Sequence, residues 1–314
     1  MMSKTGFWKR LSGQKILQCF VLLGMLYLVI FSFIPMFGII IAFKDYKISS
    51  GVSGFITSPW VGLKWFSEFV HDYKFKDLIR NTLMISFLKI LFTFPAPILF
   101  AILLNEVKNQ VVKRIIQTTS YLPHFISWVV VSGILFTFLS TSGGVINNLL
   151  LSLQVISKPL PFLYDPNYFW GLAVISDMWK DMGWWAIIFL AAIAGIDPSL
   201  YEAAQIDGAG RIARIMHVTI PAIKGAIIIV LILSVGGLLG GGMSNSNFEQ
   251  SYLLGNALNS ERAEIVQTYI LKAGLAEGRF AYAAAVDLIQ SVLSIVLLFG
   301  SNYAAKRISG TSLF

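Results

Sequence analysis

Long apolar runs alternate with shorter polar segments along the whole chain. Six runs are each long enough to cross a hydrocarbon core about 30 Å thick. They lie at about 16–43, 79–104, 121–139, 168–195, 219–240 and 281–304. The pattern therefore predicts six transmembrane helices. A shorter apolar run at 145–156 predicts an interfacial helix, because its length is marginal for crossing the membrane.

The composition agrees with lipid as the main solvent of this chain. Of 314 residues, 56% are hydrophobic and 13% are charged, whereas soluble domains average about 45–50% apolar and about 25% charged residues. We expect an all-α membrane protein, with a cytoplasmic N-terminal segment at 1–15 and a transmembrane domain at 16–314. The single cysteine, Cys19, lies inside an apolar run, so we expect a packed thiol and no disulfide.

The net charge of +8 is explained by the placement of the basic residues. Lysine and arginine concentrate on the cytoplasmic side of membrane proteins. Here they concentrate at both ends of the chain and in the 2–3 and 4–5 loops, at Lys4, Lys9, Arg10, Lys15, Lys108, Lys113, Arg114, Arg211, Arg214, Lys306 and Arg307. Both termini are therefore predicted to be cytoplasmic, and a nucleic-acid partner is not expected.

Three of the predicted spans carry polar side chains at helical spacing. These are Thr82, Ser86, Lys89 and Thr93 in the second span, Asp177, Lys180, Asp181 and Trp184 in the fourth, and Asp287, Gln290, Ser291 and Ser294 in the sixth. Ionisable groups within a bilayer face a bundle interior or a water-filled cavity. Two interpretations stay open: a hydrated path for a solute, or an interhelical network, for example a salt bridge of Lys89 with Asp181, that braces the bundle.

The loop between the fourth and fifth spans predicts a short helix at about 198–210 on the cytoplasmic face. Asp197 precedes Pro198, which is the pattern of an N-cap followed by a first-turn proline. Gly208 or Gly210 supplies the C-terminal stop. Two adjacent small residues, Ala203 and Ala204, would let the backbone of another protein approach closely.

This loop carries a motif. The pattern is EAA, three residues, G, nine residues, then I-x-L-P, and Val218 and Ile220 stand for its aliphatic I and L. The identical positions are Glu202, Ala203, Ala204, Gly208 and Pro221. The sequence thereby resembles the permease subunits of bacterial ATP-binding cassette (ABC) importers. Trp179-Lys180, Gly183-Trp184 and Phe248-Glu249-Gln250 are similar to the polysaccharide and oligosaccharide branch, including the permeases of alginate importers.

The resemblance implies a type I ABC importer permease fold, in which the segment 198–210 is the coupling helix. Its docking residues for a separate ATPase would be Glu202, Ala203, Ala204, Asp207 and Gly208. The chain has no G-x-x-x-x-G-K-[ST] loop, so we expect no cofactor here, and ATP and Mg to be bound by partner subunits. The family implies two such ATPases, a second homologous permease and an extracytoplasmic solute-binding protein, assembled in the lipid of the bacterial inner membrane.

For an oligosaccharide substrate, aromatic faces would contact sugar rings and fixed polar groups would contact hydroxyls. The candidate path residues are Lys89, Trp179, Lys180, Asp181, Trp184, Asp287 and Gln290. Phe248, Glu249 and Gln250 in the 5–6 loop are the candidate contact for the binding protein. Lys89 and Lys180 would suit an acidic sugar such as alginate.

Two other functions are alternatives to an ABC importer permease. A membrane-embedded enzyme acting on a lipid-linked sugar would need paired acids, and Asp177 with Asp181 is the one candidate pair, without a third catalytic group. A secondary carrier usually shows internal repeats, and no convincing repeat is found. His71, His124 and His217 are far apart and predict no metal site.

Overall fold

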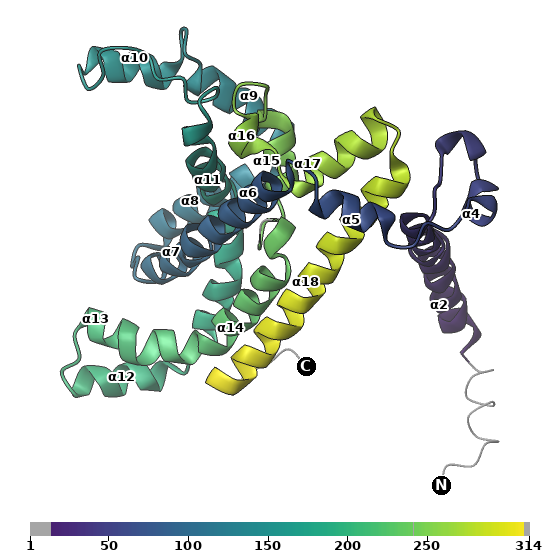
Figure 1. Cartoon of the computed structure of the whole chain (residues 1–314). Coiled ribbons are helices and arrows are strands. Elements are labelled where there is room, and N and C mark those ends of the chain that lie inside the picture. Colours follow the sequence, from purple (N-terminus) through teal and green to yellow (C-terminus); the bar gives the residue numbers. More distant parts are fainter. Residues whose placement is uncertain (1–13, 241, 311–314) are drawn as a thin grey trace, which may run out of the picture. The chain divides into compact units, whose positions relative to one another are not determined.

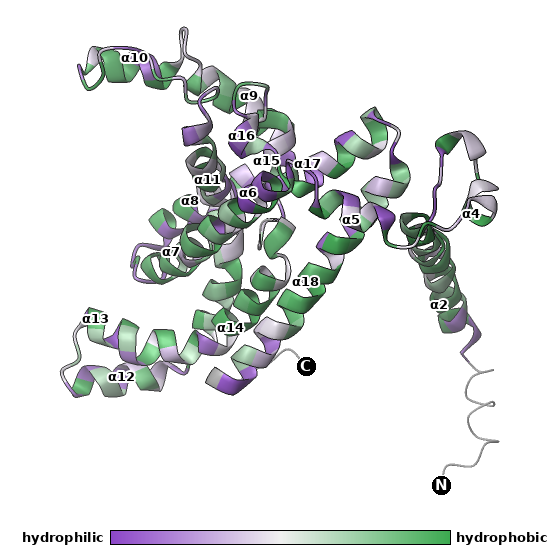
Figure 2. Cartoon of the chain, in the orientation of Figure 1, coloured by the Kyte–Doolittle hydropathy of each residue, from purple (hydrophilic) through white to green (hydrophobic). Residues whose placement is uncertain are grey.

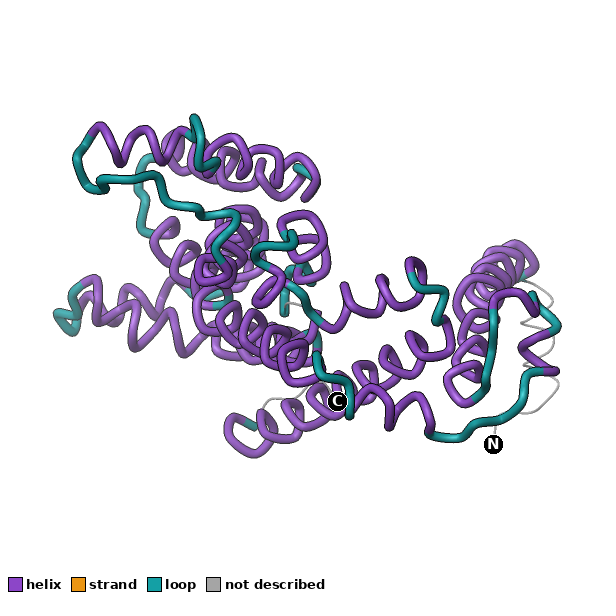
Figure 3. The backbone as a smooth tube through the Cα atoms, turned by 45° about the horizontal axis from the view of Figure 1, so that its top comes forward, coloured by secondary structure: helices purple, strands orange, loops and turns teal. Residues whose placement is uncertain are grey.

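The computed structural model describes residues 14–240 and 242–310, and this part of the chain is built from helices without a β-strand (Figure 1). An isolated antiparallel bridge pairs Lys44 with Trp60. The predicted all-α class is confirmed. Short loops join successive helices along most of the tube in Figure 3.

The elements follow the order of the chain. They are α2 (Lys15–Leu28), η1 (Val29–Phe33), α3 (Ile34–Met36), η2 (Phe37–Phe43), η3 (Ile48–Ser50), α4 (Gly54–Thr57), α5 (Lys64–Val70), α6 (Phe75–Leu88), η4 (Lys89–Thr93), α7 (Pro95–Asn105), α8 (Gln110–Tyr121), η5 (Leu122–Phe125), α9 (Trp128–Leu139), α10 (Val145–Ser152), α11 (Pro166–Ala194), α12 (Pro198–Ile206), α13 (Arg211–Arg214), η6 (Ile215–Thr219), α14 (Ile220–Gly236), η7 (Leu238–Gly240), α15 (Asn247–Leu254), α16 (Ser260–Ala263), α17 (Val266–Leu271), η8 (Lys272–Ala276) and α18 (Phe280–Ser309).

Four helices in the described residues are long and apolar enough to cross a membrane. They are Lys15–Phe43, Phe75–Asn105, Arg211–Gly236 and Phe280–Arg307, and most of their residues have the colour of hydrophobic residues in Figure 2. Two bent pairs, Gln110–Phe125 with Trp128–Leu139 and Pro166–Ala194 with Pro198–Ile206, raise the number to six if each counts as one span. The predicted first, second, fifth and sixth spans are confirmed, and the fourth lies within α11.

The third predicted span, 121–139, is wrong as a continuous helix. The chain bends by 103° between η5 and α9. Pro123 cannot donate a backbone hydrogen bond to the preceding turn, and the Ser127 hydroxyl accepts from the Val130 N–H, which starts a new helix as an N-cap. The apolar run concealed this break, because hydropathy does not register capping chemistry.

Proline also explains the π-helical segments within the spans. Among the described residues, η1, η4 and η6 each end two residues before a proline, at Pro35, Pro95 and Pro221. A proline has no N–H for the carbonyl four residues earlier. The ladder is therefore rewired there: the Phe94 N–H, for example, bonds the Lys89 carbonyl five residues back at 3.0 Å. Such bulges bend a helix locally.

The chain divides into two compact units. One contains residues up to 70 together with 271–288, and the other contains 71–270 together with 289–314. In the first unit the Lys44 ammonium donates to the Phe55 and Ile56 carbonyls at 2.7 and 2.9 Å. There the Phe69 and Tyr282 rings meet edge to face.

The second unit is organised around α11. An apolar cluster in this unit joins α7, α11 and α14 through Ala101, Ile102, Ala186, Phe189, Ile193, Ile223 and Val230. In lipid, such side chains stabilise the bundle through van der Waals packing between the helices. The interfacial helix predicted at 145–156 is shorter, α10, and the predicted 5–6 loop contains α15, α16 and α17.

Candidate functional site

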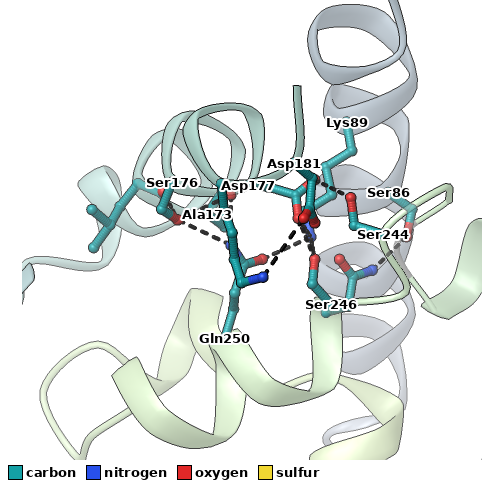
Figure 4. A network of polar contacts seen from close by, with 12 residues as sticks. Ser86, Lys89, Ala173, Ser176, Asp177, Asp181, Ser244, Ser246 and Gln250 are labelled. Atoms are coloured by element: carbon teal, nitrogen blue, oxygen red, sulfur yellow. Dashed lines mark hydrogen bonds and ion pairs between the residues drawn. The ribbon is translucent and has the colours of Figure 1, made fainter. Parts of the chain in front are cut away.

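A buried polar network joins η4, α11 and the segment that leads into α15 (Figure 4). At its centre, the Lys89 ammonium donates to the Ser246 hydroxyl and to Gln250 Oε1, both at 2.7 Å. It lies 3.6 Å from the Asp177 carboxylate. Lys89 is 2% exposed and Asp177 is 0% exposed, so the ion pair is withdrawn from solvent and needs all its hydrogen bonds.

The groups that contact the Lys89 ammonium also have other hydrogen bonds within the chain. The Ser246 hydroxyl donates to Asp177 Oδ1, and the Ser244 hydroxyl donates to Asp177 Oδ2 at 3.1 Å. Gln250 Nε2 donates to the Ala173 carbonyl at 2.8 Å. The network therefore binds the start of α15 to two membrane helices.

The Lys89–Asp181 salt bridge suggested from the sequence is replaced by Lys89 with Asp177. Asp181 lies four residues further along α11, about one helical turn away, and has other partners. Its carboxylate is 2.7 Å from His124 Nδ1 and 3.6 Å from the Lys180 ammonium. Both carboxylates are thus engaged, and the bracing interpretation describes Lys89 and Asp177.

The break in the third span is held by α11. The Lys180 ammonium donates to the His124 carbonyl at 2.7 Å, which satisfies a backbone group that the interrupted helix leaves free. The His124 ring stacks on Trp184, with 4.4 Å between ring centroids and 1° between ring planes. No sequence pattern predicts this position for His124, because its partners come from a helix more than 50 positions away.

Gly183 lets the two segments approach. A Cβ at this position would lie 2.1 Å from the Ser120 carbonyl oxygen, so a side chain does not fit without movement of the backbone. This close contact explains how the end of α8 reaches the middle of α11.

The other predicted path residues are placed differently. Trp179 is 47% exposed and lines a largely apolar pocket of 830 Å³ between α9, α10 and α11. Asp287 lies on an exposed position of α18, and Gln290 on the same helix is 9% exposed. The structure therefore brings Lys180, Asp181 and Trp184 together, whereas Asp287 and Gln290 lie on a different helix.

The three residues predicted to receive a binding protein lie on α15. Glu249 is exposed, and Phe248 stacks on Tyr252, which is 58% exposed. Gln250 is 1% exposed, because its amide is used inside the network. A contact of Gln250 with an external protein therefore conflicts with its position, whereas Phe248 and Glu249 remain at the surface.

The segment predicted as a coupling helix forms α12. The Asp197 carboxylate accepts from the Ser199 N–H at 2.9 Å, and this hydrogen bond lowers the pKa of the exposed carboxyl. The helix ends before Gly208, whose φ of +79° lies in the left-handed region that favours glycine. The observed helix, Pro198–Ile206, is shorter than the predicted 198–210. Of the two glycines predicted to end it, Gly208 is the one that does so.

The end of α12 has the hydrogen bonds of a Schellman motif. The Gly208 N–H donates to the Gln205 carbonyl at 3.1 Å, and the Ala209 N–H donates to the Ala204 carbonyl at 2.8 Å. These bonds turn the chain sharply into α13. The motif glycine thus has a local structural reason, independent of any partner.

The outward face of α12 is open. Glu202, Ala203, Asp207 and Gly208 are exposed, whereas Ala204 is half-buried. Apolar side chains also project: Leu200 is 50% exposed and Ile206 is 87% exposed. Beyond the turn, Ile212 and Met216 are 78% and 55% exposed. Ile212 and Met216 were not predicted as exposed apolar residues, although their spacing of four residues places them on one face of a helix.

In the part of the chain that the structure describes, no group of three or more His, Cys, Asp or Glu residues could hold a metal ion. Cys19 is exposed rather than packed within the chain, which corrects the expectation of a packed thiol. It lies on α2, which buries none of its own residues.

Comparison with known proteins identifies the family. Residues 93–310 match the family model of the binding-protein-dependent transport system inner membrane component. The chain is 45% identical to Protein LplB of Bacillus subtilis (strain 168) over 304 residues, which cover 97% of this chain and 92% of that protein. It is 41% identical to the polygalacturonan/rhamnogalacturonan transport system permease protein YteP of the same organism over 305 residues, with the same coverage.

Solved structures agree. A chain in the crystal structure of a bacterial ABC transporter involved in the import of the acidic polysaccharide alginate aligns with a TM-score of 0.87 and 35% identity, covering 96% of this chain and 99% of that chain. A second structure, of a bacterial alginate ABC transporter in complex with alginate pentasaccharide-bound periplasmic protein, aligns equally well over 98% of this chain and 99% of that chain. The chain therefore belongs to the inner-membrane permease family of binding-protein-dependent transport systems, and it is a non-enzymatic, membrane-spanning permease subunit of an ABC sugar importer.

Proposed function

We propose that this subunit imports an acidic oligosaccharide and that α12 docks on a separate ATPase. The observation that carries the docking proposal is the open face of α12, where Ile206 is 87% exposed at the tip of a capped helix. An exposed apolar surface on a rigid helix is typical of a protein interface.

Acidic substrates are supported by relatives. One 41% identical protein is named for transport of polygalacturonan and rhamnogalacturonan, and the first of these is by its chemical name a polymer of galacturonic acid. The aligned crystal structure belongs to an importer of the acidic polysaccharide alginate. A uronic acid unit carries one negative charge, so its importer must supply a countercharge or hydrogen-bond donors along the path.

The path contacts are assigned to the accessible side of the His124–Trp184 stack. Lys89, Lys180 and Asp181 are between 2% and 6% exposed, and their polar atoms are bonded within the chain, so we assign them to bracing. Trp184 is 37% exposed and offers the aromatic face that sugar rings prefer. Trp179 and Asp287 remain further candidates, while Gln290 is too buried to be a primary contact.

The assembly follows the family. A second permease would close the path beside this subunit, two ATPases would bind ATP and Mg, and an extracytoplasmic binding protein would deliver the sugar against Phe248 and Glu249. The 4–5 loop then faces the cytoplasm with both termini, as the positions of lysine and arginine in the sequence require.

Reconstitution of the complete complex in proteoliposomes tests the substrate class. With the binding protein and ATP supplied, an oligogalacturonate of five units and the alginate pentasaccharide are offered beside a neutral malto-oligosaccharide of equal length. We expect ATP-dependent accumulation of at least one acidic sugar and not of the neutral sugar. Equal accumulation of the neutral sugar would refute the acidic assignment.

Docking is tested in the same complex. Glu202→Ala and Ala203→Leu should reduce retention of the ATPase during affinity purification and abolish uptake, while membrane insertion is unchanged. Gln205→Ala is the matched control, since Gln205 is exposed on the same helix but is not one of the motif positions. Full retention and uptake in the Glu202 and Ala203 variants would contradict docking through α12.

A further inference from the structure

A single side-chain hydrogen bond links α12 to another helix in the described part of the chain. The Tyr201 hydroxyl and the Thr219 hydroxyl lie 2.9 Å apart. Tyr201 is half-buried, and Thr219 is 3% exposed. Tyr201 therefore points inward, while its neighbours Glu202 and Ala203 point outward. One face of α12 is exposed, and the opposite face is hydrogen-bonded to the bundle.

Thr219 lies at a mechanically distinctive position. It is the last residue of the π-helix η6, and Pro221 follows two residues later. Because Pro221 has no N–H, the ladder is rewired, and the Ile220 N–H bonds the Ile215 carbonyl. The joint between α13 and α14 is therefore irregular, and irregular turns are the places where helices bend.

The other connections of α12 and α13 to the bundle are loops and an exposed ion pair, and we expect them to transmit movement less well. A loop of three residues, 195–197, joins it to α11, and residues 207–210 join it to α13. An ion pair of Arg211 with Glu106, at 3.1 Å, ties α13 to the end of the second span. Its side chains are 61% and 30% exposed, and exposed ion pairs contribute little. The buried end of the Tyr201–Thr219 bond is shielded from water, which strengthens it.

We propose that the Tyr201–Thr219 hydrogen bond transmits movement of α12 to α14, the fifth membrane span. Tyr201 and Thr219 are positioning residues that touch neither the ATPase nor the sugar. Loss of the bond would leave α12 able to dock but free to move at the η6 joint without carrying α14 along. The inference rests on the proposed docking of α12, and it assigns docking and transmission to opposite faces of the same helix.

Isosteric variants test this division of roles. Tyr201→Phe and Thr219→Val remove one hydroxyl each and keep the shape, whereas Thr219→Ser keeps the hydroxyl. In the reconstituted complex we measure ATPase retention, ATP hydrolysis, sugar taken up per ATP hydrolysed and the thermal unfolding midpoint. The probes are the two acidic pentasaccharides, each delivered by the binding protein.

In Tyr201→Phe and Thr219→Val we expect ATPase retention to stay at the wild-type value, and the unfolding midpoint to show only the small drop that loss of one hydrogen bond produces. Sugar uptake per ATP should fall about 2- to 10-fold, the range that corresponds to one hydrogen bond. The double variant should be no worse than either single variant, because both remove the same interaction. Thr219→Ser should retain most of the wild-type uptake per ATP, because it keeps the hydroxyl. Gln205→Ala should match the wild type.

Three results would overturn the proposal. Wild-type uptake per ATP in Tyr201→Phe would show that the bond transmits nothing. A parallel loss of the ATPase would make Tyr201 a docking residue, and a lowered unfolding midpoint with normal uptake per ATP would make the bond merely structural. Failure of the docking proposal itself is recognised separately, since Glu202→Ala would then retain the ATPase and transport normally.

Discussion

The network around Lys89 and the surface of α12 each place side chains in surroundings of unlike polarity. In the network, polar groups are buried, and on α12, apolar groups are exposed. Around Lys89, charged and polar groups lie inside a membrane bundle, and nearly every one has a partner in the same chain. On α12, apolar groups lie at the surface, and Ile206 is 87% exposed in the described part of the chain. Polar groups in lipid must be satisfied locally, whereas an apolar face near water can await another protein.

The comparison shows that a charged residue within a membrane span of this protein is not necessarily accessible. Lys89 and Asp177 have the charge expected of a path, yet they are buried and bonded to Ser246 and to each other. The residues of α12 are less unusual in composition, yet Glu202, Ala203 and Ile206 are exposed. Burial and partner lists separate these roles, whereas residue type does not.

The largest expected effect comes from breaking the buried pair. Lys89→Ala leaves the Asp177 carboxylate buried without its cation, so we expect a loss of about 3–5 kcal/mol in the free energy of unfolding. Unfolding in detergent, followed by tryptophan fluorescence, measures it. Lys224→Ala, which removes an exposed lysine of α14, is the control and should change little. The double variant Lys89→Met with Asp177→Leu should recover part of the loss, because no charge is then left unpaired.

A smaller effect is expected at the close contact of α8 with α11. Gly183→Ala places a Cβ against the Ser120 carbonyl, so the helices must separate, at about 1–3 kcal/mol. Gly171→Ala on the same helix meets no atom within 4 Å and should be neutral or slightly stabilising, since alanine favours helix. The same denaturation experiment compares the two. Equal stabilities would mean that Gly183 does not set the helix spacing.

The smallest effect is expected at the start of α12. The pKa of the Asp197 carboxyl is lower in the folded chain than its ordinary value, because the ionised form accepts from the Ser199 N–H. Its stabilisation is therefore fully present above the ordinary pKa of about 3.9 and is lost as the pH falls through the lowered value. Hydrogen exchange of the peptide 198–206, corrected for the intrinsic rate, should show increased opening in this acidic range.

Asp197→Asn provides the matched control for that titration. Asparagine is also a good N-cap but does not ionise in this range. The variant should show no pH-dependent increase in opening beyond that of the rest of the chain. An identical increase in both proteins would place the titrating group elsewhere.

Much of α12 could be predicted from the sequence because its determinants are local. Asp197, Pro198 and Gly208 set the two ends of α12 through bonds to residues at most five positions away. The irregular joint at η6 follows from Pro221 in the same way. The hydrogen bond of Tyr201 to Thr219, by contrast, depends on how the chain folds back after the turn, and no spacing rule in the sequence specifies it.

The sequence by itself determined the membrane class, the approximate bounds of five spans and the family motif, since hydropathy, capping and fixed spacing act over a few residues at a time. Only the tertiary structure decided that Lys89 pairs with Asp177, that Gln250 is buried, and that His124 reaches Asp181. These outcomes depend on contacts between segments 50 to 160 positions apart. Such contacts are selected by the packing of whole helices, which no local pattern encodes.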